Sequence, residues 1–283
     1  MKLTYYPGCS LRGTSEEYDH SIQAVSRVLG LELIELDDWT CCGASSAHVL
    51  NDALANLLGA KVLGDADEAG RDVLVPCAAC YSRLKFAEKA ISQDPAKWSV
   101  NGRKTSIKVI HIHDLFSDKE LLKRLKEKVT RPLRGLRAVP YYGCLTVRPP
   151  KVVDAAQYEN PTALDEILKA IGAQPVAWSY KTDCCGGSFS ISRPDVVRKL
   201  SGDLLKAARD AGGECIVTDC PMCQANLDSR QAEIEKEQNT KFDMPILFIT
   251  ELIALALGIG GVKKWLGKHL VDSRPLLSAK GLG

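Results

Sequence analysis

Hydrophobic residues occur along the chain in two arrangements that alternate: short continuous runs, and longer stretches with a three- and four-residue repeat. The runs are typical of buried strands and the longer stretches of amphipathic helices. In the first half the order is a strand at 2–6, a helix at 16–30, an apolar run at 31–36, a helix at 51–70 and a strand at 72–77. In the second half it is a strand at 137–142, a helix at 161–172, an apolar run at 175–180, a helix at 194–212 and a strand at 214–220.

Strands that alternate with helices indicate an α/β fold with mainly parallel sheets flanked by helices. Because the same order occurs twice, we expect two pseudo-symmetric, Rossmann-like halves. In parallel sheets of this kind, sites form beyond the carboxyl ends of the strands.

The cysteines repeat in the same way as the predicted elements. Those of the first half are Cys9, Cys41, Cys42, Cys77 and Cys80, and those of the second are Cys144, Cys184, Cys185, Cys220 and Cys223. The last four of each set are separated by the same 143 residues, and both adjacent pairs are followed by glycine. Each set falls at strand ends, loops and helix starts, so we expect five thiols to converge in each half.

The repeat divides the chain into four parts. We predict a first module at 1–116, a basic connector at 117–137, a second module at 138–262 and a C-terminal tail at 263–283. The connector has eight Lys/Arg against three Asp/Glu, which is typical of a solvated helix and also suits docking of an acidic partner or substrate. The basic tail either covers a partner or frays.

The most apolar stretch, residues 245–262, is short for a membrane span and contains Glu251. We interpret it as a buried strand that continues into a core helix, ended by Gly260 and Gly261. The chain is therefore predicted to have no membrane span.

A net charge of only +2 argues against nucleic acid as a partner. The N-terminus has no apolar run long enough for a signal peptide, which favours a reducing, cytoplasmic setting. There, 11 cysteines indicate metal binding or redox chemistry rather than disulfide bonds.

Thiolate ligands suit zinc or iron–sulfur centres. Four of the five thiols in a half could enclose zinc, and four could bind a cubane [4Fe–4S] cluster, although the compact cysteine run common at cubanes is missing. Five thiols exceed either requirement, so the residues alone leave open a free thiol, a bridging thiol or another cluster shape.

The spacings C-x31-CC-x34-C-x2-C and C-x39-CC-x34-C-x2-C resemble the cysteine-rich CCG domain, and two such domains in tandem resemble the B subunit of heterodisulfide reductase. The resemblance covers about residues 1–260. It implies that each set of five cysteines binds one non-cubane [4Fe–4S] cluster, and that a disulfide is reductively cleaved between the two clusters. CoM-S-S-CoB or a related small disulfide would be the substrate.

The resemblance further implies two partners, a ferredoxin-like C subunit and a flavin-containing A subunit. An alternative function is that of an iron–sulfur electron-transfer subunit in a quinone- or flavin-linked dehydrogenase complex. Such chains typically carry a fused ferredoxin-like domain, whose cysteine run is missing here. A zinc-stabilised scaffold is a third possibility.

Few other residues are candidates for the chemistry. His48 is a weak candidate proton donor, and Arg148 and Lys181 are weak candidates for holding an anionic substrate group, with a surface role equally expected. His111 and His113 are predicted on one face of a strand, where a structural role is favoured over metal binding or proton relay. Cys215 is expected to be buried and inert. The tyrosines before each leading cysteine are interpreted as strand core, and Gly43, Gly186 and Gly187 as bends around a cluster.

Overall fold

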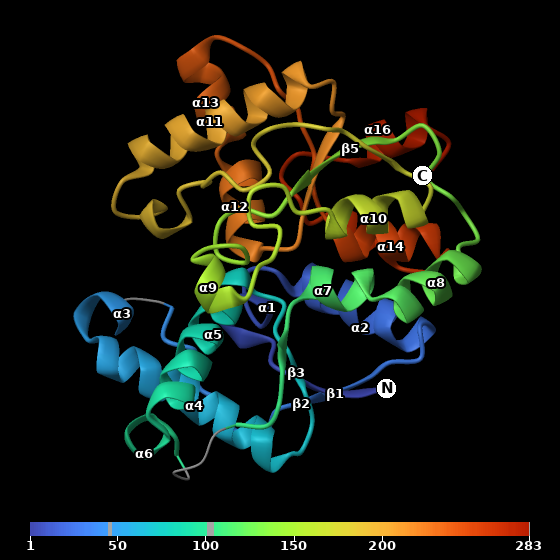
Figure 1. Ribbon diagram of the computed structural model, residues 1–283. Coiled ribbons are helices and arrows are strands. Elements are labelled where there is room, and N and C mark those ends of the chain that lie inside the picture. The colour runs from blue at the N-terminus through green and yellow to red at the C-terminus, as the bar shows by residue number, and fades with distance from the viewer. Residues whose placement is uncertain (45–46, 101–104, 283) are drawn as a thin grey trace.

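The computed structural model describes residues 1–44, 47–100 and 105–282, and it consists of two halves built on the same plan (Figure 1). Each half contains one four-stranded, all-parallel sheet, with the order β2-β1-β3-β4 in the first and β6-β5-β7-β8 in the second. The predicted α/β class is thereby confirmed.

The elements of the first half follow one another as expected from the apolar pattern. They are β1 (Lys2–Tyr5), α1 (Gly8–Leu11), α2 (Glu16–Val28), β2 (Glu32–Glu35), α3 (Ala47–Leu50), α4 (Asp52–Glu68), β3 (Val73–Leu74), α5 (Ala78–Gln93), α6 (Pro95–Trp98), β4 (Val109–Ile110), α7 (Ile112–Ser117) and α8 (Lys119–Lys128). Local sequence determines where α4 begins: Asn51 is its N-cap, and the Asn51 side chain accepts a hydrogen bond from the Leu54 backbone N–H at 3.0 Å.

The second half repeats this order. It contains β5 (Arg137–Tyr141), α9 (Pro150–Val153), α10 (Ala163–Ala170), β6 (Gln174–Pro175), the short 3₁₀ helix η1 (Gly187–Phe189), α11 (Pro194–Asp210), β7 (Cys215–Thr218), α12 (Pro221–Ser229), α13 (Gln231–Gln238), β8 (Ile246–Phe248), α14 (Ile249–Ala256), α15 (Val262–Leu266) and α16 (Arg274–Ala279). All four residues of β7 are buried, as expected for a central parallel strand with helices on both faces.

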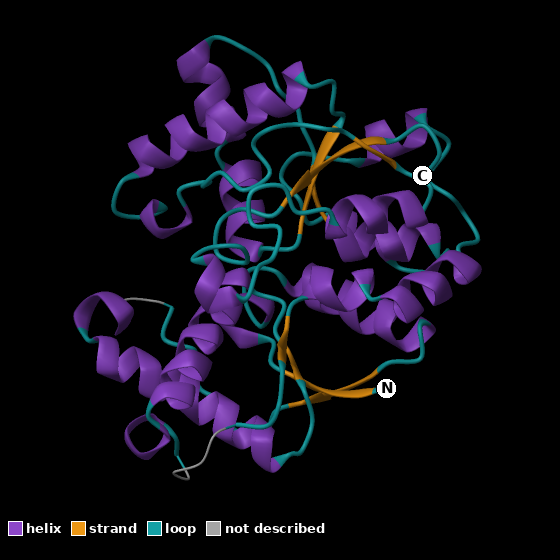
Figure 2. Cartoon of the chain, viewed as in Figure 1, coloured by secondary structure: helices purple, strands orange, loops and turns teal. Residues whose placement is uncertain are grey.

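The halves meet through four helices that lie between the two sheets (Figures 1 and 2). Each half contributes two of these helices, and they pack in pairs across the interface, α2 on α14 and α10 on α7. Tyr18 of α2 stacks on Phe248, with ring centroids 4.0 Å apart, and the hydroxyls of Ser21 and Thr250 are 2.6 Å apart. Since one apolar core extends across this contact, the halves are packed as one unit.

A second contact between the halves joins α5 to the loop after α9. Asp154 has a left-handed φ of 56° at the end of α9 and forms ion pairs with Lys85 at 2.8 Å and Lys89 at 2.7 Å. The Tyr81 hydroxyl donates a hydrogen bond to the Val153 carbonyl at 3.3 Å. These contacts connect α5, the helix that carries Cys80, to the second half.

The apolar stretch at 245–262 is a buried strand followed by a core helix, as predicted, but the helix ends earlier than expected. Helix α14 stops at Ala256, and Gly258, with φ +69°, occupies the left-handed position after it. The expected stop at Gly260 and Gly261 is wrong because the last buried turn ends at Leu257. None of the helices in the described ranges is long and apolar enough to cross a membrane.

The prediction that His111 and His113 lie on one face of a strand is also wrong. Strand β4 ends at Ile110, so His111 is the N-cap of α7 and His113 lies in its first turn. Both side chains are nevertheless buried, and their rings lie side by side.

The basic segment 117–137 contains the amphipathic helix α8, which buries Leu121 and Leu125. Within residues 263–282 the tail packs on the rest of the chain, because α15 lies on α2 and Leu277 of α16 is buried. The boundaries of the four predicted parts stay a prediction.

Candidate functional site

The cysteines of the first half come together at the carboxyl ends of β1 and β3. Cys9 lies in α1, Cys77 is the N-cap of α5 and Cys80 lies in its first turn. The adjacent pair Cys41–Cys42 lies in the loop that precedes α3. Three chain segments far apart in the sequence therefore supply one group of thiols.

The second half repeats the arrangement. Cys144 follows β5, Cys184 and Cys185 lie in the loop before η1, and Cys220 and Cys223 lie at the N-cap and in the first turn of α12. In each half the second cysteine of the adjacent pair lies against the last cysteine of the CxxC motif, with sulfur–sulfur distances of 3.1 Å for Cys42–Cys80 and 3.5 Å for Cys185–Cys223. A disulfide bond is close to 2.05 Å, so these contacts join thiols.

Because the thiols lie close together, neighbouring cysteines have pKa values that are shifted in opposite directions. Hydrogen bonds with Cys41 and Cys80 lower the pKa of Cys42 to about 3, whereas the pKa of Cys80 is raised. The Cys144 thiol likewise lowers the pKa of Cys184 to about 6 while its own pKa is raised. Five thiolates in one group would repel one another, and several bound metal ions would neutralise them. The donor set therefore suits a centre with more than one positive metal ion.

The backbone around both groups is shaped to bring the chain close to sulfur. The N–H of Gly43 donates to the Cys41 sulfur at 3.4 Å, and that of Gly186 donates to the Cys184 sulfur at 3.2 Å. A Cβ at Gly8 would lie 3.1 Å from the Cys80 sulfur, and one at Gly143 only 2.9 Å from the Cys223 sulfur. Sulfur donors, N–H groups directed at sulfur and room for close approach all fit an iron–sulfur centre.

One functional feature of both sites was not predicted. Tyr6 and Tyr141, which we interpreted only as core, occupy equivalent positions and donate hydrogen bonds of 2.7 Å to the carbonyls of Thr40 and Asp183. These carbonyls immediately precede the two adjacent cysteine pairs. Burial and then the nearby thiols, Cys80 and Cys223 first, raise the pKa of each phenol, so both stay protonated donors. The repeated tyrosine three residues before each leading cysteine was the available signal.

We expect Tyr141→Phe to loosen the loop that carries Cys184 and Cys185. Loss of the hydrogen bond to the Asp183 carbonyl should cost about 1 kcal/mol of folding free energy and speed the release of iron to a chelator. The measurement is the rate of iron release from anaerobic protein, compared with Tyr158→Phe at an exposed tyrosine. Equal rates for the two variants would show that the hydroxyl does not position the loop.

Both thiol groups lie on the side of their half that faces the interface. Ala78, beside Cys77, belongs to the apolar cluster of the second half that includes Cys220 and Cys223. The Tyr18 hydroxyl donates to the Asp219 carbonyl at 2.9 Å, and after burial and Asp219, charges at Cys220 and Cys77 both contribute to its raised pKa. One phenol from the first half is thus within electrostatic reach of a cysteine from each set.

The three weak candidates outside the cysteine sets are placed differently. His48 is exposed on α3. Lys181 is buried, and its ammonium group donates to the Pro161 carbonyl at 3.0 Å and to both Asp165 oxygens at 2.9 Å, which is a structural ion pair. Arg148 is exposed, and its guanidinium donates to the Thr182 hydroxyl at 3.3 Å, two residues before Cys184.

One of the matched positions at which the two sites differ lies three residues after the last cysteine. In the first half this is Arg83, whose half-buried guanidinium lies within electrostatic reach of Cys42. In the second half it is Asn226, whose amide donates to the Cys185 sulfur at 3.7 Å. Cys215 lies outside both groups, fully buried on β7, and burial raises its pKa to about 12.

Comparison with known proteins shows which family the chain resembles. The family model of the cysteine-rich CCG domain matches residues 3–85 and 139–228. The 8-methylmenaquinol:fumarate reductase membrane anchor subunit of Wolinella succinogenes is 31% identical over 283 residues, which cover 97% of this chain and 99% of that one. The B subunit of the ferredoxin/F(420)H(2)-dependent CoB-CoM heterodisulfide reductase of Methanosarcina acetivorans is 28% identical over 270 residues, 91% of this chain and 89% of that one.

A solved structure supports the fold alone. A hypothetical protein from Helicobacter pylori superimposes with a TM-score of 0.73 at 11% identity, over 96% of this chain and 52% of that one.

Two equivalent α/β halves, each with a converging set of five thiols, define the class: a redox subunit of the iron–sulfur type. Within that class the chain belongs to the family of proteins with tandem cysteine-rich CCG domains, whose members include the B subunits of heterodisulfide reductases.

Proposed function

We propose that this chain is the catalytic subunit of a heterodisulfide-reductase-like complex and reductively cleaves a low-molecular-weight disulfide. The reaction is RS–SR′ + 2 e⁻ + 2 H⁺ → RSH + R′SH. Two non-cubane [4Fe–4S] clusters would be held by Cys9, Cys41, Cys42, Cys77 and Cys80, and by Cys144, Cys184, Cys185, Cys220 and Cys223. When bound, they would supply one-electron transfer and Lewis acidity toward sulfur.

One observation carries the proposal: both thiol groups face the interface between the halves, where Tyr18 lies within electrostatic reach of Cys77 and of Cys220. Cleavage of one disulfide needs two electrons, and two adjacent one-electron centres match that number. The chain's own residues keep this arrangement rigid. Tyr6 and Tyr141 hold the two cysteine loops, and Lys85, Lys89 and Asp154 fix one half against the other.

The electrons would come from partner subunits, a ferredoxin-like C subunit and a flavin-containing A subunit. The relatives named as B subunits of CoB-CoM heterodisulfide reductases support assembly into such a complex. Exposure of Cys9, Cys41 and Cys184 supports access to both centres from outside this chain. Arg148, exposed beside the second site, is the better placed of the basic candidates for an anionic substrate group.

A second function has its own support. The relative from W. succinogenes, at 31% identity over nearly the whole of both chains, is named as a subunit of an 8-methylmenaquinol:fumarate reductase. In an assembly of that kind the two clusters would relay electrons between a quinol and a flavin-linked partner, and no disulfide would be cleaved.

An experiment with thiols separates the two functions. Anaerobically purified protein is oxidised with and without coenzyme M, coenzyme B and other small thiols, and its EPR spectrum is recorded. We expect a paramagnetic signal that requires a thiol, together with disulfide reduction driven by a reduced viologen dye. Clusters that cycle fully with the dye but respond to no thiol and reduce no disulfide would contradict disulfide cleavage and favour electron relay.

A further inference from the structure

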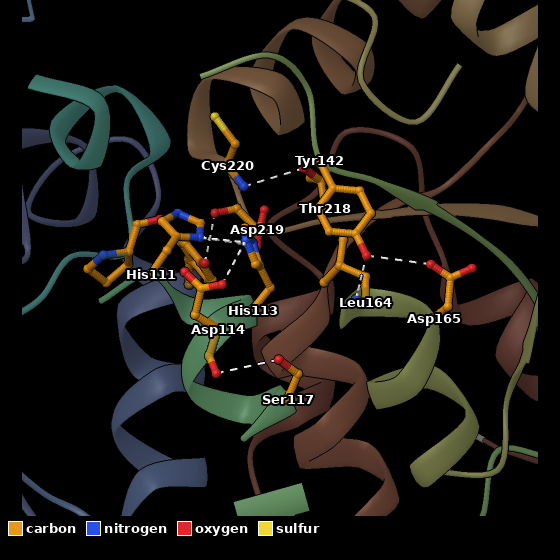
Figure 3. Close-up of polar contacts among 12 residues, drawn as sticks. His111, His113, Asp114, Ser117, Tyr142, Leu164, Asp165, Thr218, Asp219 and Cys220 are labelled. Atoms are coloured by element: carbon orange, nitrogen blue, oxygen red, sulfur yellow. Dashed lines mark hydrogen bonds and ion pairs between the residues drawn. The ribbon is translucent and has the colours of Figure 1, made fainter. Parts of the chain in front are cut away.

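Three buried side chains that the cysteine sites do not use converge at the interface between the halves (Figure 3). His111 and His113 come from the start of α7 in the first half, and Asp219 comes from the end of β7 in the second half. Their exposed fractions are 0%, 6% and 0%. Asp219 immediately precedes Cys220, and His111 contacts the carbonyl of Pro76, which immediately precedes Cys77.

Three ligand-type atoms of these side chains form a small triangle. His113 Nδ1 lies 2.5 Å from Asp219 Oδ2, His111 Nδ1 lies 3.3 Å from the same oxygen, and the two Nδ1 atoms are 3.1 Å apart. An ion placed about 1 Å out of their plane would lie at about 2.0–2.2 Å from all three, which is the usual range for zinc bound to imidazole and carboxylate.

The outer nitrogens of both rings face acceptors. His111 Nε2 lies 3.0 Å from the Pro76 carbonyl and so carries the proton, which leaves the lone pair of Nδ1 directed into the triangle. His113 Nε2 lies 3.5 Å from a carboxylate oxygen of Asp114. A ring whose outer N–H donates to a carbonyl, as in His111, is the arrangement that orients metal-binding histidines.

The centre of the triangle is rich in electrons. One proton on His113 Nδ1 satisfies the contact with Asp219, but the lone pair of His111 then still faces a carboxylate oxygen. The other oxygen, Asp219 Oδ1, is buried and has no hydrogen-bond partner among the described residues. Buried acceptors left without a donor or a cation cost free energy, so the group is suited to bind positive charge.

We propose that His111, His113 and Asp219 bind a divalent transition-metal ion of the zinc class, which joins the two halves. Imidazole nitrogens suit transition metals and not calcium or magnesium, which prefer oxygen ligands. The site has no thiolate ligand, so its chemistry differs from that of the cysteine sets. A cavity of about 810 Å³ between α5, α7, α9 and α10 is lined by His113 and Asp114 and provides an access route. The proposal is independent of which reaction the clusters perform.

The internal repeat supports a dedicated role for the three residues. By the strand registers, Asp219 is equivalent to Pro76, His111 to Phe248 and His113 to Thr250. The second copy of the site thus has no metal ligand at any of the three positions. Both halves share one fold, but the three ligand residues occur at only one of the two equivalent places. The shared fold alone therefore does not explain why they are there.

The test uses the cluster-loaded full chain, produced anaerobically with zinc or cobalt in the medium. We expect about one zinc or cobalt ion per chain beyond the cluster iron, with only nitrogen and oxygen donors and imidazole scattering in its X-ray absorption spectrum. His113→Thr, which copies the residue of the other half, should weaken binding about 100-fold. His20→Thr, at an exposed histidine, should bind like the parent protein. The ion should also raise the Tm of the parent and not that of His113→Thr.

Three results would overturn the proposal: sulfur in the coordination shell of the extra metal, undiminished nitrogen–oxygen binding in His113→Thr, or no binding by the parent protein at millimolar metal. The last result would mean that protons, not a metal ion, neutralise the group. The spectrum of cobalt bound to the parent protein needs no variant, so the test stands even if His113→Thr does not fold.

Discussion

Replacing Cys185 with alanine should remove the iron–sulfur centre of the second half and abolish any reaction that needs both centres. Cys185 is buried, its sulfur lies 3.5 Å from that of Cys223, and the Asn226 amide donates to it, so the sulfur stands at the centre of the thiol group. Iron and sulfide should fall to about half, because each cluster depends on its own set of thiolates. Cys42→Ala should remove the iron–sulfur centre of the first half in the same way.

The matched control is Cys215→Ala. Cys215 is also buried in the second half, but it lies on β7 outside the cysteine set. That variant should lose some stability from the cavity it creates and keep its full iron and sulfide. Iron and sulfide are measured on anaerobic protein with the EPR spectrum of each variant. A complete iron content in Cys185→Ala, or loss of both centres in Cys215→Ala, would contradict the assignment of ligands.

The sequence was sufficient to predict the parallel sheets and the convergence of five cysteines in each half. Two local signals carried these predictions: strand-like and helix-like apolar patterns in fixed alternation, and a cysteine frame repeated at a constant offset. In parallel α/β halves the carboxyl ends of neighbouring strands meet at one edge, so residues placed after β1, β3, β5 and β7 must come together.

What the sequence did not reveal depends on contacts between the halves. Asp219 is a single carboxylate between Thr218 and Cys220, and its partner His113 lies 106 residues away on the other half. No pattern within one half predicts such a contact. The available signal was a difference between the copies, since the residue before the CxxC motif is Pro76 in one and Asp219 in the other. The misplaced end of α14 has a similar cause, because Gly258, Gly260 and Gly261 are equally good stops until packing shows which turn is the last one buried.

The second large effect is expected at Gly143, where the backbone passes directly over a cysteine. Gly143 has φ +67°, and an added Cβ would lie 2.9 Å from the Cys223 sulfur. Gly143→Ala therefore combines about 1–2 kcal/mol of left-handed strain with an overlap that costs about 1–3 kcal/mol and displaces the sulfur. We expect Gly143→Ala to lose the centre of the second half as well as stability.

Gly135→Ala is the control that separates backbone strain from overlap with the cysteine sulfur. Gly135 also has a positive φ, +80°, but a Cβ there would meet nothing within 4 Å, so only the strain remains. Gly8→Ala and Gly70→Ala form the corresponding pair in the first half, with the Cys80 sulfur at 3.1 Å in one and open space in the other. Iron content and urea unfolding are measured for all four variants. If close approach to sulfur is what these glycines provide, iron should fall in the order Gly143→Ala, then Gly8→Ala, with both controls fully loaded. Equal iron loss in Gly143→Ala and Gly135→Ala would show that backbone strain alone accounts for the glycine.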